Sequence, residues 1–368
     1  MDRIEKYFIA KADKLSYIEL KNKKSDYRDL GIEDIPLPII VDDLMDGISK
    51  QDFSNKLELK YIVDGMLYNL AIDKDFKYNS DYVTVLNKIL KEPETYAVKR
   101  GVDFLSQNED RALVFFRAAF ILKDSYAYGA YNYARLLWRV ALEEKSSFVE
   151  QSIRILERII RYDESFVLAY YELGEINLAL GDFIKADSFY RKSLQLAEDE
   201  NVKNEIREKI NSIFPDVAVA NAIYYINRMD YNKSIEILLD ARKNSLRYDI
   251  PYYIAVSYVN MEKSDMAEIY FEEAIEKGAD FATLYVDYTY VKYVLGKDVE
   301  ALRIADQALE KYPTDIKLRY NRAIINIELG KYDKANEDFD FILEYQDLSD
   351  ELFNQIMIIK ESMKNRGA

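Results

Sequence analysis

Apolar residues recur along most of the chain at the three- and four-residue spacing of an amphipathic helix, and this pattern repeats itself. Three segments of the same design begin at Tyr248, Ala282 and Ile316, which are 34 residues apart. Each segment has the pattern of one helix, a short turn and a second helix. The spacing therefore predicts a row of helical hairpins over this part of the chain.

Small side chains stand at fixed places in these segments. On the two helices of each segment they are Ala255, Ala267, Ala274, Ala301, Ala308, Ala323 and Ala335. Small residues let two antiparallel helices approach to ~8–10 Å, and a large neighbour such as Phe271 fills the gap between them. A helical bundle with alanine-rich seams is the alternative, but a bundle does not keep one phase over three copies.

Two earlier segments fit the same template. Val167–Glu200 carries the small residues Gly174 and Ala186, and Pro215–Ser245 carries Ala222. Short turns that join a glycine to a polar and an aromatic residue separate the helices in several copies; examples are Gly181-Asp182-Phe183 and Gly330-Lys331-Tyr332.

The small–large–small triples and these turns resemble the tetratricopeptide repeat, whose period is 34 residues. The likeness covers Val167–Ser349 with one interruption. It implies an all-α fold, an α-solenoid in which antiparallel helix pairs form a right-handed superhelix that a C-terminal helix caps. Toward the N-terminus the pairs are degenerate, and the long pair over Tyr126–Tyr162 resembles the Sel1-like variant of the repeat.

These patterns divide the chain into five parts. Residues 1–55 carry no repeat and either cap the first pair or form a small separate element, and residues 56–200 hold the degenerate, Sel1-like and clear helix pairs. Residues 201–214 break the phase as an extra helix or an extension of the helix before them, after which Pro215 opens a new helix. Such a junction bends the array, divides it, or is a tolerated insertion. The array resumes over 215–349, and 350–368 supply the capping helix and a tail.

The resemblance implies that the first helix of each pair lines a concave groove. By position on those helices, the groove residues are Tyr131, Arg135, Trp138, Tyr171, Ile223, Tyr252, Val256, Tyr290, Tyr293, Tyr320 and Ile324. Tyrosine offers a large contact area with few rotatable bonds, which suits recognition of an amphipathic helix or an extended apolar peptide. The alternative is that many of these rings pack between repeats. Only Lys317 and Asn321 match the clamp with which some members of the family hold a peptide carboxylate.

Composition removes several classes of function. The formal net charge is −15, which opposes binding to nucleic acid or to an anionic membrane surface. Cys and His are both absent, so thiol and imidazole catalysis and nearly every zinc site are excluded. The sequence has no phosphate-binding glycine loop, and its paired carboxylates are typical of a solvated face. We therefore expect no cofactor, no metal and no catalysis by this chain.

The sequence favours a scaffold that binds a protein or peptide. A peptide-sensing regulator is the first alternative, because some bacterial sensors are repeat arrays with a non-repeat N-terminal bundle, and an accessory subunit of an enzyme complex is the second. No apolar run approaches the ~18 residues of a membrane span, and the charged start is unlike a signal peptide, so we expect a cytoplasmic protein. The sequence is compatible with a monomer and with a homo-oligomer.

The small residues at the helix crossings, which together we call the seam, yield a first prediction. Ala267→Leu should destabilise the fold by roughly 1–3 kcal/mol, because the added atoms overfill a helix crossing. Lys263→Glu, a surface change on the turn nearby, should leave the melting temperature nearly unchanged. Equal melting temperatures for the two variants would refute the seam.

Overall fold

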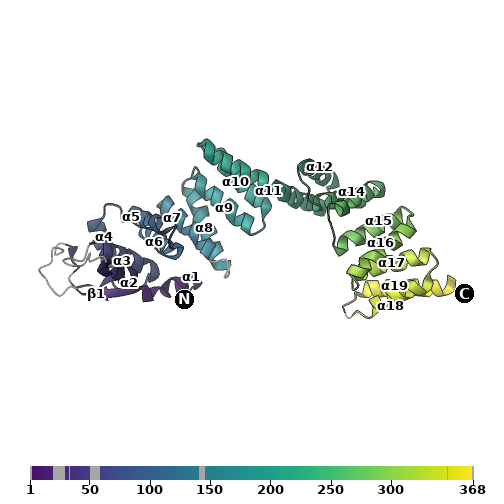
Figure 1. Ribbon diagram of the computed structural model, residues 1–368, viewed down its shortest axis with the longest axis horizontal. Coiled ribbons are helices and arrows are strands. Elements are labelled where there is room, and N and C mark those ends of the chain that lie inside the picture. Colours follow the sequence, from purple (N-terminus) through teal and green to yellow (C-terminus); the bar gives the residue numbers. More distant parts are fainter. Residues whose placement is uncertain are drawn as a thin grey trace. The chain divides into compact units, whose positions relative to one another are not determined.

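The computed structural model describes residues 2–19, 30–32, 34–49, 59–140, 146–345 and 347–366 (Figure 1). Within these ranges the chain forms nineteen α-helices, one short 3₁₀-helix and a single two-stranded sheet. The predicted all-α solenoid of helix pairs is therefore confirmed, whereas the handedness of its superhelix stays a prediction. None of the described helices is both long and apolar enough to cross a membrane. The chain divides into two compact units, Met1–Ile210 and Asn211–Ala368.

Unit 1 contains four helix pairs that follow one another along the chain. Their bounds are α3 (Leu59–Ile72) with α4 (Asn79–Ile89), α5 (Pro93–Phe104) with α6 (Glu109–Leu122), α7 (Ala127–Val140) with α8 (Ser146–Tyr162), and α9 (Val167–Ala179) with α10 (Phe183–Leu196). Helix α10 starts where the carboxylate of Asp182 accepts a hydrogen bond from the backbone N–H of Lys185, at 3.1 Å. The pair α7–α8 begins at Ala127 and the next at Val167, a longer interval than 34 residues. Its Sel1-like character stays a prediction.

Unit 2 continues the same architecture. After α11 (Glu200–Asn227) come α12 (Tyr231–Arg242), α13 (Asp249–Asn260), α14 (Ser264–Glu276), α15 (Ala282–Val294), α16 (Asp298–Lys311), α17 (Ile316–Glu328), α18 (Tyr332–Leu343) and α19 (Asp350–Arg366). Helices α15 and α17 begin at the residues where the sequence pattern restarts, and α13 begins one residue after it. Ala267 and Ala274 of α14 and Ala323 of α17 are completely or almost completely buried, as small residues at helix crossings should be.

Helix α11 corrects the predicted boundary at residues 201–214. These residues do not extend the preceding helix, because α10 ends at Leu196, and Pro215 does not open a helix. One helix instead runs from Glu200 to Asn227 with Pro215 in its interior. The boundary between the two units falls within this helix, between Ile210 and Asn211. The apolar spacing over residues 201–214 correctly predicted a helix there. Pro215 wrongly suggested that a new helix begins at that residue.

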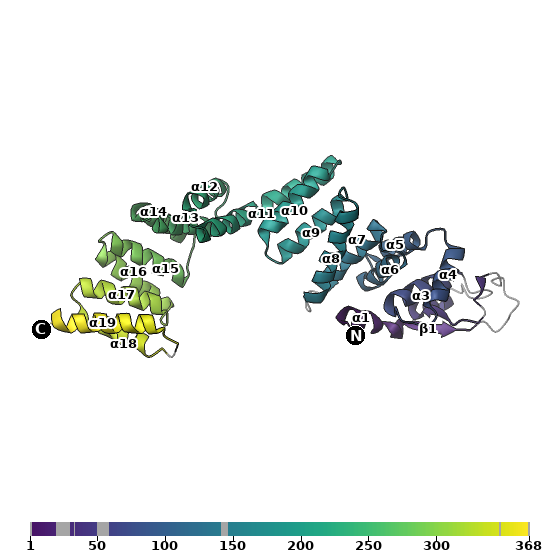
Figure 2. The ribbon, with the colours of Figure 1, turned by 180° about the vertical axis from the view of Figure 1, so that it is seen from behind.

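The N-terminal segment belongs to the core of unit 1. It consists of α1 (Arg3–Ile9), a 3₁₀-helix over Ala12–Lys14, β1 (Leu15–Ile18), β2 (Leu37–Ile40) and α2 (Val41–Ser49). The two strands pair antiparallel, with Leu15 opposite Ile40. Strand β2 is buried along its whole length and packs on α3, and α1 contacts α3 as well (Figure 2). The described part of the segment therefore packs on unit 1: its strand β2 lies on α3 of the first pair, and α1 contacts both α3 and α8.

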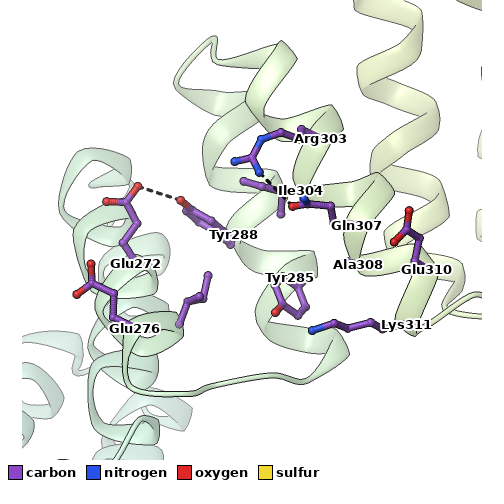
Figure 3. A pocket seen from close by; sticks show the side chains of 11 residues that line it. Glu272, Glu276, Tyr285, Tyr288, Arg303, Ile304, Gln307, Ala308, Glu310 and Lys311 are labelled. Atoms are coloured by element: carbon purple, nitrogen blue, oxygen red, sulfur yellow. Dashed lines mark hydrogen bonds between the residues drawn. The ribbon is translucent and has the colours of Figure 1, made fainter.

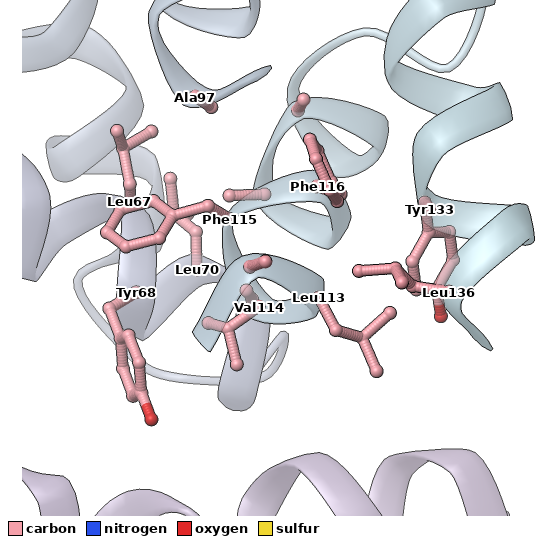
Figure 4. Close-up of a cluster of buried hydrophobic side chains, with 14 of the residues drawn as sticks. Leu67, Tyr68, Leu70, Ala97, Leu113, Val114, Phe115, Phe116, Tyr133 and Leu136 are labelled. Carbon is pink, nitrogen blue, oxygen red and sulfur yellow. The ribbon is translucent and has the colours of Figure 1, made fainter. Parts of the chain in front are cut away.

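The core of unit 1 is a continuous cluster of aliphatic and aromatic side chains. Helix α6 stands at its centre and buries eight consecutive residues, Ala112–Ala119, of which Leu113–Phe116 are labelled in Figure 4. Leu67 of α3 and Tyr133 of α7 belong to the same cluster. Because α6 is buried on several sides, the N-terminal segment and the first three pairs share one core rather than forming separate domains.

Gly65 of α3 lies where β2 crosses the helix, and it yields a second prediction. A Cβ at this position would overlap the backbone carbonyl oxygen of Pro38. Gly65→Ala should therefore destabilise unit 1 by about 1–3 kcal/mol or more, since backbone rather than a flexible side chain must move. Gly129→Ala in α7 is the matched control, because its Cβ would approach side-chain atoms only to 3.1–3.2 Å. Thermal unfolding compares them, and a melting temperature for Gly65→Ala at or above the control would contradict the packing.

Candidate functional site

The first helices of neighbouring pairs in unit 2 lie side by side, and α15 and α17 contact each other directly. Tyr290 and Tyr293 occupy one face of α15, and Tyr320 and Ile324 occupy the facing side of α17. These four side chains line one cavity of about 210 Å³, together with Thr289, Asn321 and Ile325. We call it the α15–α17 cavity. The structure thus brings together four of the eleven residues that the sequence assigned to the groove.

The cavity wall is apolar and open to solvent at its rim. Tyr290 is 49% exposed, whereas Tyr293, Tyr320 and Ile324 are half-buried. Burial raises the pKa of Tyr293, with a smaller contribution from the Glu328 carboxylate, and burial also raises the pKa of Tyr320. Both phenols therefore stay protonated near neutral pH and are able to donate a hydrogen bond. Within the described part of the chain, the three tyrosine hydroxyls of the cavity have no hydrogen-bond partner.

Two polar residues complete the cavity. The side-chain amide of Asn321 donates to the backbone carbonyl of Val286 at 2.9 Å, which ties α17 to α15. The hydroxyl of Thr289 is buried and lacks a partner among the described residues. Asn321 thus serves the helix contact, and Lys317, the other residue matching a carboxylate clamp, is exposed and lines no part of this cavity.

Three predicted groove residues are buried instead: Tyr252 and Trp138, and also Tyr131, which is 7% exposed and is described below. Tyr252 of α13 is 8% exposed, and its ring packs against Phe271 and Phe281. Its hydroxyl donates to the carboxylate of Asp287 at 3.1 Å, and burial raises its pKa. Trp138 of α7 is buried too, and its indole N–H donates to Glu172 at 2.8 Å. A partner cannot reach either ring without unfolding the pair, so the alternative of packing between repeats holds for both.

Ile223 and Val256 are neither fully buried nor part of the α15–α17 cavity. Ile223 of α11 packs against the cluster that holds Ala222 and Leu238, and Val256 of α13 packs against the cluster around Phe271. Both are half-buried. Their remaining surface adds to the face of the first helices, but neither lines the α15–α17 cavity.

The remaining predicted groove residues meet in unit 1. Tyr131 and Arg135 of α7 and Tyr171 of α9 line a second cavity of about 210 Å³, which the start of α11 closes with Val202, Glu205 and Ile206. Its floor is the carboxylate of Glu172, which is 1% exposed. Burial raises the pKa of Glu172, and the guanidinium of Arg139 at 3.2 Å opposes that rise.

This second cavity differs from the first in its charge. Burial next to Glu172 raises the pKa of Tyr131 to about 12. Tyr171 donates its hydroxyl hydrogen to Glu205 at 3.1 Å, so its polar group is already used. Because the polar groups here largely satisfy one another, the wall offers a partner fewer free contacts than the α15–α17 cavity does.

A third cavity, of about 580 Å³, lies between α14 and α16 above the rings of Tyr285 and Tyr288 (Figure 3). Its rim carries both signs of charge. Tyr288 donates to Glu272 at 2.9 Å, and Lys311 pairs with Asp280 at 2.8 Å. Beside it, the buried ammonium of Lys292 lies 2.5 Å from Glu268, 3.1 Å from Glu272 and 2.9 Å from Glu300. This network joins three helices and is a structural element.

The sequence did not single out Glu172 or Lys292. Each stands among apolar residues on a first helix, and a charge in such a run must find a partner when it is buried. The sequence therefore indicates two buried charges. It does not identify their partners, because Arg139 and Glu268 lie on other helices.

Comparison with known proteins agrees with the repeat pattern. Family models described as tetratricopeptide repeat match residues 167–200 in unit 1 and 252–276 and 304–335 in unit 2. No curated protein sequence matches the chain.

Solved structures similar to parts of the chain include three proteins of low identity. A crystal structure of MamA protein is 18% identical, covers 48% of this chain and 90% of its own, and has a TM-score of 0.37. The TPR domain of P58(IPK) is 14% identical, covers 74% and 99%, and has a TM-score of 0.31. The TPR2AB domain of yeast Sti1, solved as a complex with pHSP90, is 16% identical, covers 66% and 98%, and has a TM-score of 0.27.

Two of the family matches cover the pairs α9–α10 and α13–α14, and the third covers α17 with parts of α16 and α18. The chain therefore contains tetratricopeptide repeats in both of its compact units.

Proposed function

We propose that this chain is a non-catalytic scaffold that binds a protein or peptide partner through the α15–α17 cavity. Tetratricopeptide repeat proteins generally act as scaffolds for protein interaction. The observation that carries the proposal for this site is the cluster of Tyr290, Tyr293 and Tyr320 around an apolar cavity, with hydroxyls that the described chain leaves without partners. None of these three hydroxyls is among the buried polar atoms that lack a partner, so they reach solvent and are free to bond polar groups of a bound protein.

The partner would insert an apolar side chain between α15 and α17. Full burial of one such side chain contributes about 1.5–3 kcal/mol, which alone gives only weak binding. Further contacts must therefore come from the rim, where Tyr290 is 49% exposed, and from other exposed residues of α15 such as Val294. The tyrosine hydroxyls supply hydrogen bonds to a partner's backbone. An amphipathic helix or an extended segment with apolar side chains at regular intervals fits these requirements.

Charge sets how such a partner approaches. The chain carries a formal net charge of −15, although the two helices that form the cavity hold four basic residues against two acidic ones. A partner with basic residues beside its apolar anchor would be attracted over long range, and its association rate would fall with added salt.

The peptide-sensing regulator remains a second candidate, as does an accessory subunit of an enzyme complex. The sensor hypothesis rests on residues 1–55, which carry no repeat. The described part of that segment packs into the core of unit 1, so it gives the sensor no support beyond what a structural cap explains. Both candidates would use the same cavity to hold a peptide or a subunit.

Burial distinguishes two tyrosines that the sequence placed in one groove, and this gives a third prediction. Tyr252→Ala should lower the free energy of unfolding by about 3–5 kcal/mol, because it empties a packed site and removes the bond to Asp287. Tyr290→Ala should change that free energy by less than about 0.5 kcal/mol, as is usual for exposed positions. Urea unfolding followed by circular dichroism measures both values. Comparable losses for the two variants would show that Tyr290 is not a surface residue.

The fourth prediction concerns binding. A protein with Tyr290→Ala and Ile324→Ala together should lose the partners that the unchanged chain captures from extract of its own cells, because the two changes remove opposite walls of the cavity. Val299→Ala is the matched control, since Val299 is 74% exposed on α16 and lines none of the three cavities. Retention of the same partners by the double variant, at unchanged stability, would place the binding site elsewhere.

A further inference from the structure

The second cavity, which lies in unit 1, contains a hydrogen-bond donor and an acceptor that the chain itself does not join. We call it the α7–α9 cavity, after the helices that carry Arg135 and Glu172. Arg139 and Trp138 both donate to Oε1 of the Glu172 carboxylate, at 3.2 and 2.8 Å. The other oxygen, Oε2, lies 4.0 Å from Nε of Arg135, which is too far for a hydrogen bond.

Both of these groups can be reached from the cavity. Glu172 is only 1% exposed, but its Oε2 is not among the described buried polar atoms that lack a partner, so this oxygen keeps some surface at the cavity that Glu172 lines. The side chain of Arg135 is 37% exposed, and its guanidinium donates no hydrogen bond within the described chain. The phenol of Tyr131 lies beside the same carboxylate, because burial first and then Glu172 raise its pKa. An entering group therefore meets the donor and the acceptor together.

The charges that line this cavity balance one another. Arg135 and Arg139 contribute two positive charges, and Glu172 and Glu205 contribute two negative charges. An anion that entered would meet the two carboxylates, and a cation would meet the two guanidiniums. A like charge at close range disfavours either ligand. The lining therefore selects a neutral group.

A carboxamide is the neutral group that satisfies both open positions. Its carbonyl oxygen accepts a hydrogen bond, as the guanidinium of Arg135 requires, and its NH₂ donates one, as Oε2 of Glu172 requires. A neighbouring carboxylate does not upset this balance: Glu175, three residues beyond Glu172 on α9, is paired with Lys209 at 2.9 Å.

The size and the walls of the cavity suit a single side chain. Its volume is about 210 Å³, whereas sites for whole small molecules usually begin at ~300 Å³. Leu168 and Val202 at its sides are 38% and 37% exposed, so an apolar neighbour of the entering residue can pack on them. Because Glu172 lies at the floor and is almost fully buried, a side chain reaches it where a peptide backbone does not.

We propose that the α7–α9 cavity binds the carboxamide of a glutamine or asparagine side chain that follows an apolar residue in a peptide partner. The carbonyl oxygen accepts from the guanidinium of Arg135, and the NH₂ group donates to Oε2 of Glu172. The site lies in unit 1, so it does not depend on the α15–α17 cavity of unit 2.

Fluorescence of the full chain tests this selectivity, because Trp138 is its one tryptophan and donates to the carboxylate in question. The probes are four blocked peptides, acetyl-Ala-Leu-Gln-Ala-amide and the same peptide with Met, Glu or Lys in place of Gln. The Gln peptide should change the emission and saturate below about 10 mM, as weak contacts do. The other three should bind at least about tenfold more weakly, because each leaves a polar group unpaired or meets a like charge. Free N-acetyltryptophanamide controls for quenching by the peptides.

Two substitutions should change which peptide binds best. Arg135→Met leaves one positive and two negative charges in the lining, so the Lys peptide should gain over the Gln peptide. Glu172→Gln leaves two positive charges and one negative charge, so the Glu peptide should gain instead. Arg154→Met is the matched control, because Arg154 lies on α8, pairs with Glu150 one turn away and lines none of the three cavities. This control should keep the order of the unchanged chain. Circular dichroism checks each fold, and Arg135→Met decides if Glu172→Gln fails to fold.

Four results would overturn the proposal. An emission that no peptide changes would show that the cavity binds no such side chain. Equal binding of the Met peptide would mean that the carboxamide is not read, and tighter binding of the Glu or Lys peptide by the unchanged chain would mean that the ligand is charged. An unaltered preference in folded Arg135→Met would exclude Arg135 as the donor. The double variant Tyr290→Ala with Ile324→Ala should bind the Gln peptide as the unchanged chain does, which separates this test from that of the α15–α17 cavity.

Discussion

Antiparallel helices in this protein approach so closely that only small side chains fit where they cross, and the rest of the structure depends on that approach. A Cβ at Gly174 would lie 2.6 Å from the ring of Tyr190, and one at Gly101 would lie 2.4–2.9 Å from the ring of Phe116. Each small residue thus makes room for an aromatic ring from the neighbouring helix. The ring fills the pair's core, and stacked pairs leave the face of the first helices as the surface available for contact.

How far the sequence predicts this structure depends on whether a feature is set locally. The period and the seams follow from side-chain size at fixed spacing, so the helices expected at Tyr248, Ala282 and Ile316 begin within one residue of those positions. Pro215 misled, because proline is common in the first turn of a helix and rare in its interior, where it removes a backbone hydrogen bond and the surrounding packing must hold the helix together. Tyr252 and Tyr290 have the same side chain on equivalent helices, yet Phe271 and Phe281 cover only Tyr252. Exposure of that kind is decided by neighbours distant in sequence.

Buried charges also determine how neighbouring helices pack, because each must meet an opposite charge on another helix. Lys292 contacts carboxylates from α14 and α16, and Asp338 receives both Arg319 and Arg322. Hydrogen bonds from Lys292 lower the pKa of Glu300, and those from Lys292 and Lys297 outweigh burial to lower the pKa of Glu268. A carboxyl group with a lowered pKa stabilises the fold above its ordinary pKa, and that stabilisation is lost as the pH falls through the folded value. Acid should therefore loosen the contacts between α14, α15 and α16 while apolar seams remain closed.

The continuous helix α11 affects how the repeat array unfolds. Proline has no N–H, so the carbonyl group of Asn211 lacks the intrahelical donor that residue 215 would otherwise supply. That gap in the backbone ladder coincides with the boundary between the two units. Repeat arrays unfold as blocks whose coupling is only as strong as the junction between them. Amide hydrogens near Asn211 should accordingly exchange with solvent sooner than those in the middle of either block, and the two blocks should melt with separate cooperativities.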